Sequence, residues 1–232
     1  IDTMYKRILQ SPLTARGAYI YSDNDFIFLG KIVEQLTGKT LDEYVKQNFY
    51  LPLRMSSTGF YPYFYTEKDR IAPTEKENFF RQQLLQGDVH DPGAAMFGGV
   101  AGHAGLFSNA YDLLQLYRML LNGGQWQGIR YIKPETIQYF TNYQSTVSRR
   151  GLGFDKPEQD NQSRQHPYPA KSASALTFGH TGYTGTCVWV DPAFQLIYIF
   201  LSNRVCPDGG SNNKLSSLQV RENILETVYE SI

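Results

Sequence analysis

A glycine-rich segment of this chain carries side chains that could take part in catalysis. It runs Phe178-Gly-His-Thr-Gly-Tyr-Thr-Gly-Thr186, and an apolar run over residues 187–190 follows it directly. The glycines lack a Cβ atom, so backbone or substrate can approach closely, and the apolar run predicts that the segment lies at the rim of a sheet. His180 could then donate or accept a hydrogen bond near neutral pH. The alternative is a bulge at a strand edge, with a structural role for His180.

A tyrosine, a serine and an aspartate stand together near the start of the chain, at Tyr21-Ser22-Asp23. They lead into a stretch whose apolar residues recur at helical spacing and which ends at Gly38, a residue type typical of the position just after a helix. A phenol has an ordinary pKa of about 10, so Tyr21 needs nearby positive charge to act as a base at neutral pH. The alternative is that Tyr21, one of 17 tyrosines, simply packs.

Two further histidines stand between these segments. His103 lies among small residues in the segment Gly98-Gly-Val-Ala-Gly-His-Ala-Gly-Leu-Phe-Ser108. Contact with substrate and a role in ordering the loop are both open for it. His90 lies between carboxylates in Asp88-Val-His-Asp91, but no fixed ligand spacing or second cluster accompanies it. A loop-stabilising role is therefore favoured over a metal site, and we expect no metal and no cofactor.

The three segments, in this order, resemble those of class C β-lactamase-related and penicillin-binding-protein-like serine hydrolases, including the family VIII carboxylesterases. The resemblance covers essentially the whole chain. It implies an α/β (α+β) fold of the β-lactamase/transpeptidase kind, in which an antiparallel sheet is flanked by helices and joined to a mainly helical lobe. In the family, strands near the N-terminus also belong to the sheet; this chain lacks them, so we expect one edge or face of the sheet to be incomplete.

The resemblance also implies roles for individual residues. Tyr21 matches the tyrosine that helps to deprotonate the nucleophile, and His180 stands in the place of the lysine of the Lys-Thr-Gly signature. His180, Thr181 and Gly182 would line the substrate site, and the backbone N–H of Tyr183 would form half of the oxyanion hole. We therefore expect Tyr21 and His180 to face one cleft.

Two more positions follow from the same resemblance. Asp23 stands where β-lactamases carry an asparagine, and a carboxylate cannot donate a hydrogen bond to a substrate amide. This substitution favours an esterase or a peptidase over a β-lactamase. His103 belongs to the segment that lines the cleft in the family.

The Ser-x-x-Lys signature that supplies the family's nucleophile has no counterpart before Tyr21. One match, Ser211-Asn-Asn-Lys214, lies in a polar stretch near the C-terminus, where we expect Ser211 to cap the last helix. We therefore expect the chain to be a C-terminal portion of a longer protein and to be inactive by itself.

The composition of the chain limits which classes of partner we expect. The chain has 232 residues, 41% of them hydrophobic, and a net charge of zero, which gives no indication of nucleic acid or of an anionic membrane surface. No apolar run approaches the length of a membrane span. Two cysteines, Cys187 and Cys206, form neither a disulfide framework nor a metal motif. The expected partners are a small-molecule, peptide or glycan substrate and other domains of the parent, which we expect in the periplasm or outside the cell.

The spacing of apolar residues and the capping residues predict the order of helices and strands along the chain. Residues 1 to about 143 are expected to form a mainly helical lobe, and residues from about 175 to 232 the sheet strands and a final helix. Predicted helices are residues 3–9, the stretch before Gly38, a helix opened by a capping box at Thr40, helices beginning after Asn109 and at Pro134, and residues 215–232; predicted strands are residues 175–181, 186–190 and 196–202.

Two functions fit these observations. The first is a serine hydrolase that transfers the acyl group of an ester or amide, acting as an esterase, peptidase or β-lactamase-like enzyme. The alternative is a catalytically inactive, hydrolase-like module that binds substrate or assists a larger enzyme of the cell wall or of glycan processing.

Overall fold

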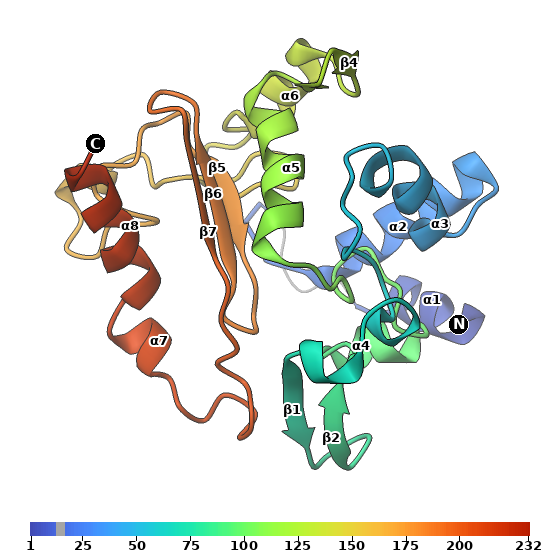
Figure 1. Cartoon of the computed structure of the whole chain (residues 1–232). Helices are drawn as coiled ribbons and strands as arrows, with labels where there is room; N and C mark the ends of the chain where they lie inside the picture. The colour runs from blue at the N-terminus through green and yellow to red at the C-terminus, as the bar shows by residue number, and fades with distance from the viewer. Residues whose placement is uncertain (13–16) are drawn as a thin grey trace. The chain divides into compact units, whose positions relative to one another are not determined.

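The computed structural model describes residues 1–12 and 17–232, which divide into two compact units, residues 1–108 and 109–232 (Figure 1). The expected division into a helical part up to about residue 143 and a sheet part from about 175 stays a prediction. Within the described ranges, no helix has the length and apolar character needed to cross a membrane.

The first unit is mainly helical. It contains α1 (Asp2–Leu9), α2 (Asp23–Thr37), α3 (Leu41–Val45), a π-helical turn (Lys46–Tyr50), two 3-10 turns (Pro62–Phe64 and Lys68–Arg70), the strands β1 (Pro73–Glu77) and β2 (Gln83–Gln86), and α4 (Pro92–Met96).

Helix α2 begins and ends where its sequence predicts. The hydroxyl of Ser22 accepts a hydrogen bond from the N–H of Asn24 (3.2 Å), which satisfies one of the donors left over at a helix start. Gly38 ends the helix in the left-handed conformation, with φ of 67°. The Tyr21-Ser22-Asp23 segment is thereby fixed at the N-terminus of α2.

The segment of residues 98–108 packs tightly on α2. A Cβ atom on Gly102 would collide with the carbonyl oxygen of Phe26, and one on Gly30 would lie 3.2 Å from the backbone nitrogen of Gly102. Only glycine allows this approach. Two of the three segments singled out in the sequence thus lie side by side in the first unit.

Residues 61–95, whose sequence has no clear periodicity, contain a hairpin. Strands β1 and β2 pair antiparallel, and the carboxylate of Glu77 holds their turn. It accepts hydrogen bonds from the backbone N–H groups of Phe79, Phe80, Arg81 and Gln82. A turn that is held by one side chain leaves no hydrophobic periodicity in the sequence from which it could be predicted.

The second unit contains the main sheet. Its elements are α5 (Ala110–Leu121), the short strands β3 (Gln125–Trp126) and β4 (Ile129–Arg130), α6 (Pro134–Thr141), a 3-10 turn (Asn161–Ser163), the strands β5 (Phe178–Thr181), β6 (Cys187–Asp191) and β7 (Leu196–Phe200), and the helices α7 (Lys214–Ser217) and α8 (Val220–Glu230).

The sheet is antiparallel, with strand order β5-β6-β7 and with Phe178 opposite Val190. Within this unit α8 lies on one side of the sheet and α5 on the other (Figure 1). The helix-flanked antiparallel sheet and the α/β class predicted from the sequence are confirmed. The α8 side forms a buried cluster: Ala170, Ala173, Cys187, Trp189, Tyr198, Leu225 and Tyr229.

The C-terminal helix is not continuous, contrary to the prediction for residues 215–232. Gln219 adopts a left-handed backbone conformation, with φ of 49°, and separates α7 from α8. The residue preceding α7 is Asn213 rather than Ser211, whose hydroxyl instead donates to the carbonyl of Asp208. The predicted cap at Ser211 is therefore wrong, because local hydrogen bonding in the preceding loop uses its hydroxyl.

Asp191, at the end of β6, ties three parts of the second unit together. Its side chain is 1% exposed. The carboxylate accepts hydrogen bonds from the Ser174 hydroxyl (2.6 Å), the Thr177 hydroxyl (2.8 Å) and the Tyr229 hydroxyl (2.7 Å). Burial raises the pKa of Asp191, but these hydrogen bonds outweigh it and the net pKa lies below its ordinary value.

Asp191→Asn should lower the free energy of unfolding of the second unit by about 2 kcal/mol at pH 7, because a neutral amide replaces a charged acceptor of several donors. Because the pKa of Asp191 is lower in the folded than in the unfolded chain, its ionised carboxylate stabilises the fold at pH values above the unfolded pKa of about 3.9. This stabilisation is lost as the pH falls through the folded pKa. The difference from wild type should therefore shrink below about pH 4.

Urea unfolding followed by tryptophan fluorescence measures this, because both tryptophans, Trp126 and Trp189, lie in the second unit. The exposed Asp69 provides the control substitution, Asp69→Asn. A difference that stays constant from pH 7 to pH 3 would contradict the role given to the ionised carboxylate.

Candidate active site

Strand β5 is paired on both of its edges at Gly179. On one edge it pairs with β6, with Gly179 opposite Trp189. On the other edge Gly179 exchanges two backbone hydrogen bonds with Asp155, of 2.7 and 3.0 Å. A Cβ atom at Gly179 would collide with the carbonyl oxygen of Val188 and lie 2.8 Å from the ring of Trp189. The glycine before His180 is therefore required by packing.

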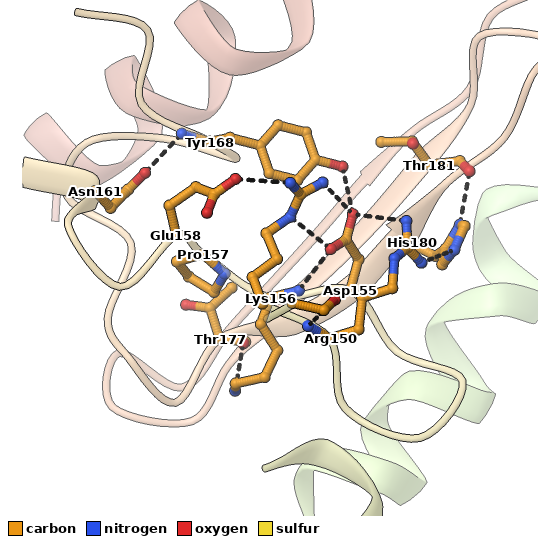
Figure 2. A network of polar contacts seen from close by, with 12 residues as sticks. Arg150, Asp155, Lys156, Pro157, Glu158, Asn161, Tyr168, Thr177, His180 and Thr181 are labelled. Atoms are coloured by element: carbon orange, nitrogen blue, oxygen red, sulfur yellow. Dashed lines mark hydrogen bonds and ion pairs between the residues drawn. The ribbon is translucent and has the colours of Figure 1, made fainter. Parts of the chain in front are cut away.

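His180, the next residue, is held in one tautomer. Its Nε2 atom lies 2.7 Å from Nη1 of Arg150, and its Nδ1 atom lies 2.7 Å from the carbonyl oxygen of Thr181 (Figure 2). A guanidinium can only donate, so Nε2 accepts and Nδ1 carries the proton. Burial is the main cause that lowers the pKa of His180, and the charge of Arg150 acts in the same direction. The imidazole is neutral at pH 7.

A buried carboxylate, Asp155, organises the surroundings of His180. Its side chain is 1% exposed and lies in a fork with Arg149, whose Nε and Nη2 atoms are 2.7 and 3.0 Å from its two oxygens. The Tyr168 hydroxyl donates to the same carboxylate (3.0 Å), and Nη2 of Arg150 lies 3.4 Å away (Figure 2). Burial lowers the pKa of Arg149, but the hydrogen bonds to Asp155 raise it above its usual value.

This network was missed in the sequence. Arg149, Arg150 and Asp155 precede a polar stretch without periodicity, and Tyr168 lies inside it. The available signal was two adjacent arginines followed, five residues after the second, by an aspartate. Nothing in that spacing indicates a contact with a residue thirty positions along the chain.

The residues after His180 form a tight turn. The N–H of Gly182 donates to the carbonyl of Thr186 (2.8 Å), and a Cβ atom on Gly182 would collide with the hydroxyl of that threonine. Arg204 donates from Nε to the carbonyl of Tyr183 (2.7 Å) and stacks 4.5 Å from the centre of its ring. The turn therefore fixes the backbone of Tyr183, whose predicted role as an oxyanion-hole donor stays a prediction.

Tyr21 and Asp23 lie in the first unit. Tyr21 is 56% exposed and directly precedes the cap residue of α2. Asp23 is the first residue of that helix, where a negative charge is favourable next to the helix dipole. Because Tyr21 belongs to one unit and His180 to the other, the expectation that they face one cleft stays a prediction.

His103 is buried beside an aspartate. Its side chain is 4% exposed, and its Nε2 atom lies 2.8 Å from Oδ1 of Asp91. The same oxygen accepts the N–H of Ala94 and so caps α4. The hydrogen bond with His103 is the main cause that lowers the pKa of Asp91. These contacts join the loop of His103 to α4, as the loop-ordering alternative requires; substrate contact stays a prediction.

His90 lies 3.3 Å from the carboxylate of Glu75 on β1. In the ranges 1–12 and 17–232, no group of three or more His, Cys, Asp or Glu side chains could hold a metal ion.

A cavity of about 420 Å³ lies in the second unit, away from the predicted site residues. Its lining consists of Tyr143, residues 157–163, Ala173 and Ala175. One lining residue, Glu158, accepts from Nη1 of Arg149 (2.7 Å), so the cavity wall is part of the same ionic network.

Gly179→Ala should lower the free energy of unfolding of the second unit by about 3 kcal/mol, because the added methyl group must push strand β6 away. Gly128→Ala is the control: Gly128 has φ of 81° but no atom within 4 Å of a new Cβ. That change should cost only about 1–2 kcal/mol of backbone strain. Urea unfolding by tryptophan fluorescence compares them, and equal losses would refute the packing argument.

His180 should titrate with a midpoint below 6.5, the value for an unperturbed histidine. Arg150→Met should raise that midpoint, because a neighbouring positive charge is removed. NMR of a histidine-labelled chain can follow each ring, since there are four histidines. A midpoint at or above 6.5 in the wild type would contradict the neutral, buried imidazole.

Comparison with known proteins identifies the family of the chain. Residues 2–220 match the Beta-lactamase family. The chain is 37% identical over 198 residues to the "Putative D-alanyl-D-alanine carboxypeptidase" of Escherichia coli (strain K12), covering 80% of this chain and 45% of that protein. It is also 37% identical over 198 residues to the N-acetylmuramyl-L-alanine amidase of Bacillus subtilis (strain 168), covering 80% and 44%. The chain thus spans about half the length of these relatives.

Solved structures show the same fold. EstCE1, a hydrolase with promiscuous acyltransferase activity, matches with a TM-score of 0.61 and 20% identity, covering 91% of this chain and 58% of that one. A penicillin-binding protein homologue from Caulobacter crescentus matches with a TM-score of 0.60 and 18% identity, covering 96% and 60%. The chain therefore belongs to the Beta-lactamase family of penicillin-binding-protein-like serine hydrolases.

Proposed function

We propose that this chain is a C-terminal portion of a serine hydrolase that transfers the acyl group of an ester or amide. The observation that carries the proposal is the edge of β5, where a neutral His180 is held in a single tautomer beside a rigid glycine turn. Preorganised donors and acceptors of this kind are what acyl transfer needs, because the reacting carbonyl develops negative charge in the transition state.

The nucleophile in this proposal is a serine upstream of Ile1, in a Ser-x-x-Lys segment. Its hydroxyl would attack the carbonyl carbon, with the lysine and Tyr21 accepting the proton. The leaving group would depart with that proton, and water would then hydrolyse the acyl-enzyme. Neither Ser22 nor Ser211 offers a substitute: Ser22 caps α2, and Ser211 lies in an exposed loop that ends before α7.

The substrate class we propose is an amide or ester of cell-wall peptides. Two relatives that are each 37% identical carry the names of a D-alanyl-D-alanine carboxypeptidase and of an N-acetylmuramyl-L-alanine amidase, and both names describe amide bonds of such peptides. A parent protein acting on such substrates would lie in the periplasm or outside the cell.

The alternative, an inactive module that binds such substrates, makes the opposite prediction for the longer protein. The 232-residue chain should leave nitrocefin and p-nitrophenyl esters uncleaved. Extension through an upstream Ser-x-x-Lys segment should restore ester cleavage if the chain is part of an enzyme. A longer protein that binds substrate but cleaves nothing would support the binding module instead.

In the active longer protein, Tyr21→Phe should lower kcat by about 10²–10⁴, the usual contribution of a general base. Tyr19→Phe, two residues away, is the matched control and should leave kcat nearly unchanged. Steady-state hydrolysis of p-nitrophenyl acetate measures both. Labelling of one serine in the 232-residue chain by a fluorophosphonate would show that the nucleophile lies within it and would overturn this assignment.

A further inference from the structure

Three consecutive carbonyl groups of the turn after β5 accept hydrogen bonds from one segment of the chain, which follows β7. Arg204 donates from Nε to the carbonyl of Tyr183 (2.7 Å) and from its backbone N–H to the carbonyl of Thr184 (2.8 Å). The hydroxyl of Ser202 donates to the carbonyl of Gly185 (2.9 Å). We call this segment, from Ser202 to Arg204, the clamp.

The orientation of the Tyr183 N–H follows from a hydrogen bond within the turn. The carbonyl of Gly182 accepts from the N–H of Gly185 (3.0 Å), so this carbonyl points into the turn. The carbonyl and the N–H of a trans peptide group point in opposite directions. The N–H of Tyr183 belongs to the same peptide group as the Gly182 carbonyl and therefore points out of the turn. An oxyanion-hole donor needs this orientation, because the substrate oxygen must reach it.

The side chain of Arg204 holds the middle peptide group of the turn. The peptide groups on either side are held by backbone bonds, from the N–H of Gly185 to the Gly182 carbonyl and from the N–H of Arg204 to the Thr184 carbonyl. The carbonyl of Tyr183, between them, accepts its bond from the guanidinium. Without that bond the peptide group after Tyr183 can rotate, and the backbone dihedral angles of Tyr183 change with it.

Packing on the clamp, and not burial, restrains Tyr183. The residue is 66% exposed, and its ring lies 4.5 Å from the guanidinium of Arg204. A Cβ atom on Gly185 would lie 2.6 Å from the hydroxyl of Ser202, and one on Gly210 would lie 2.9 Å from Nη1 of Arg204. The clamp is therefore packed closely between the turn and the loop that contains Gly210.

We propose that Arg204 is a positioning residue for acyl transfer, which keeps the N–H of Tyr183 in place as an oxyanion donor by holding the carbonyl of the same residue. The inference rests on the proposed function. A misplacement of about 1 Å in an active site can lower the rate about 10²-fold. Arg204 acts through the backbone of the turn, so its loss should weaken stabilisation of the transition state more than binding of the substrate.

Hydrogen exchange followed by NMR tests the clamp in the 232-residue chain, with the bonded N–H of Gly185 as the reporter. Arg204→Met removes the side-chain donor but keeps the backbone N–H, and it should raise the exchange rate at Gly185 at least about tenfold, because the turn opens more often. Arg130→Met is the matched control, since Arg130 also donates to a carbonyl, that of Gly123 (2.9 Å), in another loop of the second unit. Unchanged exchange in Arg204→Met, or an equal rise in both variants, would overturn the proposal.

Steady-state kinetics of the longer protein test the effect on catalysis. Arg204→Met should lower kcat for p-nitrophenyl acetate at least about tenfold and change KM by less than about threefold, because the displaced donor matters most once the oxyanion forms. Arg130→Met should leave both constants nearly unchanged, and tryptophan fluorescence on unfolding verifies that the variants fold. A wild-type kcat in Arg204→Met, or a rise in KM alone, would refute the assignment.

The conservative variant Arg204→Lys separates the hydrogen bond from the bulk of the side chain. Lysine keeps a positive charge and a donor on a flexible stem of similar length. The variant should keep Gly185 exchange close to wild type and kcat within about threefold of it. If Arg204→Lys protects Gly185 as wild type does but loses as much kcat as Arg204→Met, the guanidinium does not act by positioning the turn, and the proposal fails.

Failure of this inference and failure of the proposed function give different results. An active longer protein whose kcat does not depend on Arg204 would refute the positioning role, although the function stands. A wild-type longer protein that cleaves no ester would refute the function and, with it, the catalytic role of the clamp, whatever the exchange at Gly185 shows.

Discussion

The arrangement of the second unit around β5 depends on burying the carboxylate of Asp155. Removing a carboxylate from water is costly unless donors replace the lost hydration. Arg149, Arg150 and Tyr168 provide them from the same chain segment and from the loop that follows. Since the backbone of Asp155 also pairs with Gly179, the side-chain network and the sheet edge cannot move independently. The position of His180 follows from both.

The difference between local signals and contacts between distant residues explains what could be predicted from the sequence. Helix α2 and the strands β5 to β7 follow from apolar spacing, glycines and caps, which are local signals read over a few residues. The glycine motif around His180 is local in the same sense. The contact of Arg150 with His180 is not a local signal, because the two residues lie thirty positions apart in the chain. Its neighbours Arg149 and Asp155 look like ordinary surface charges in the sequence.

The differences between expectation and structure have a related cause. The hairpin β1–β2 turns around Glu77, and the C-terminal helix breaks at Gln219. In the hairpin, the carboxylate of one polar residue decides the backbone path. Side-chain hydrogen bonds to backbone groups compete with regular secondary structure, and the sequence pattern does not show which of them forms.

Carboxylates that accept several hydrogen bonds therefore hold the loops of this chain in place, as apolar stripes hold its helices. Asp91 joins the His103 segment to α4 in the first unit, and Asp191 joins the end of β6 to α8 in the second. Loops held in this way can present catalytic groups rigidly without belonging to a regular element.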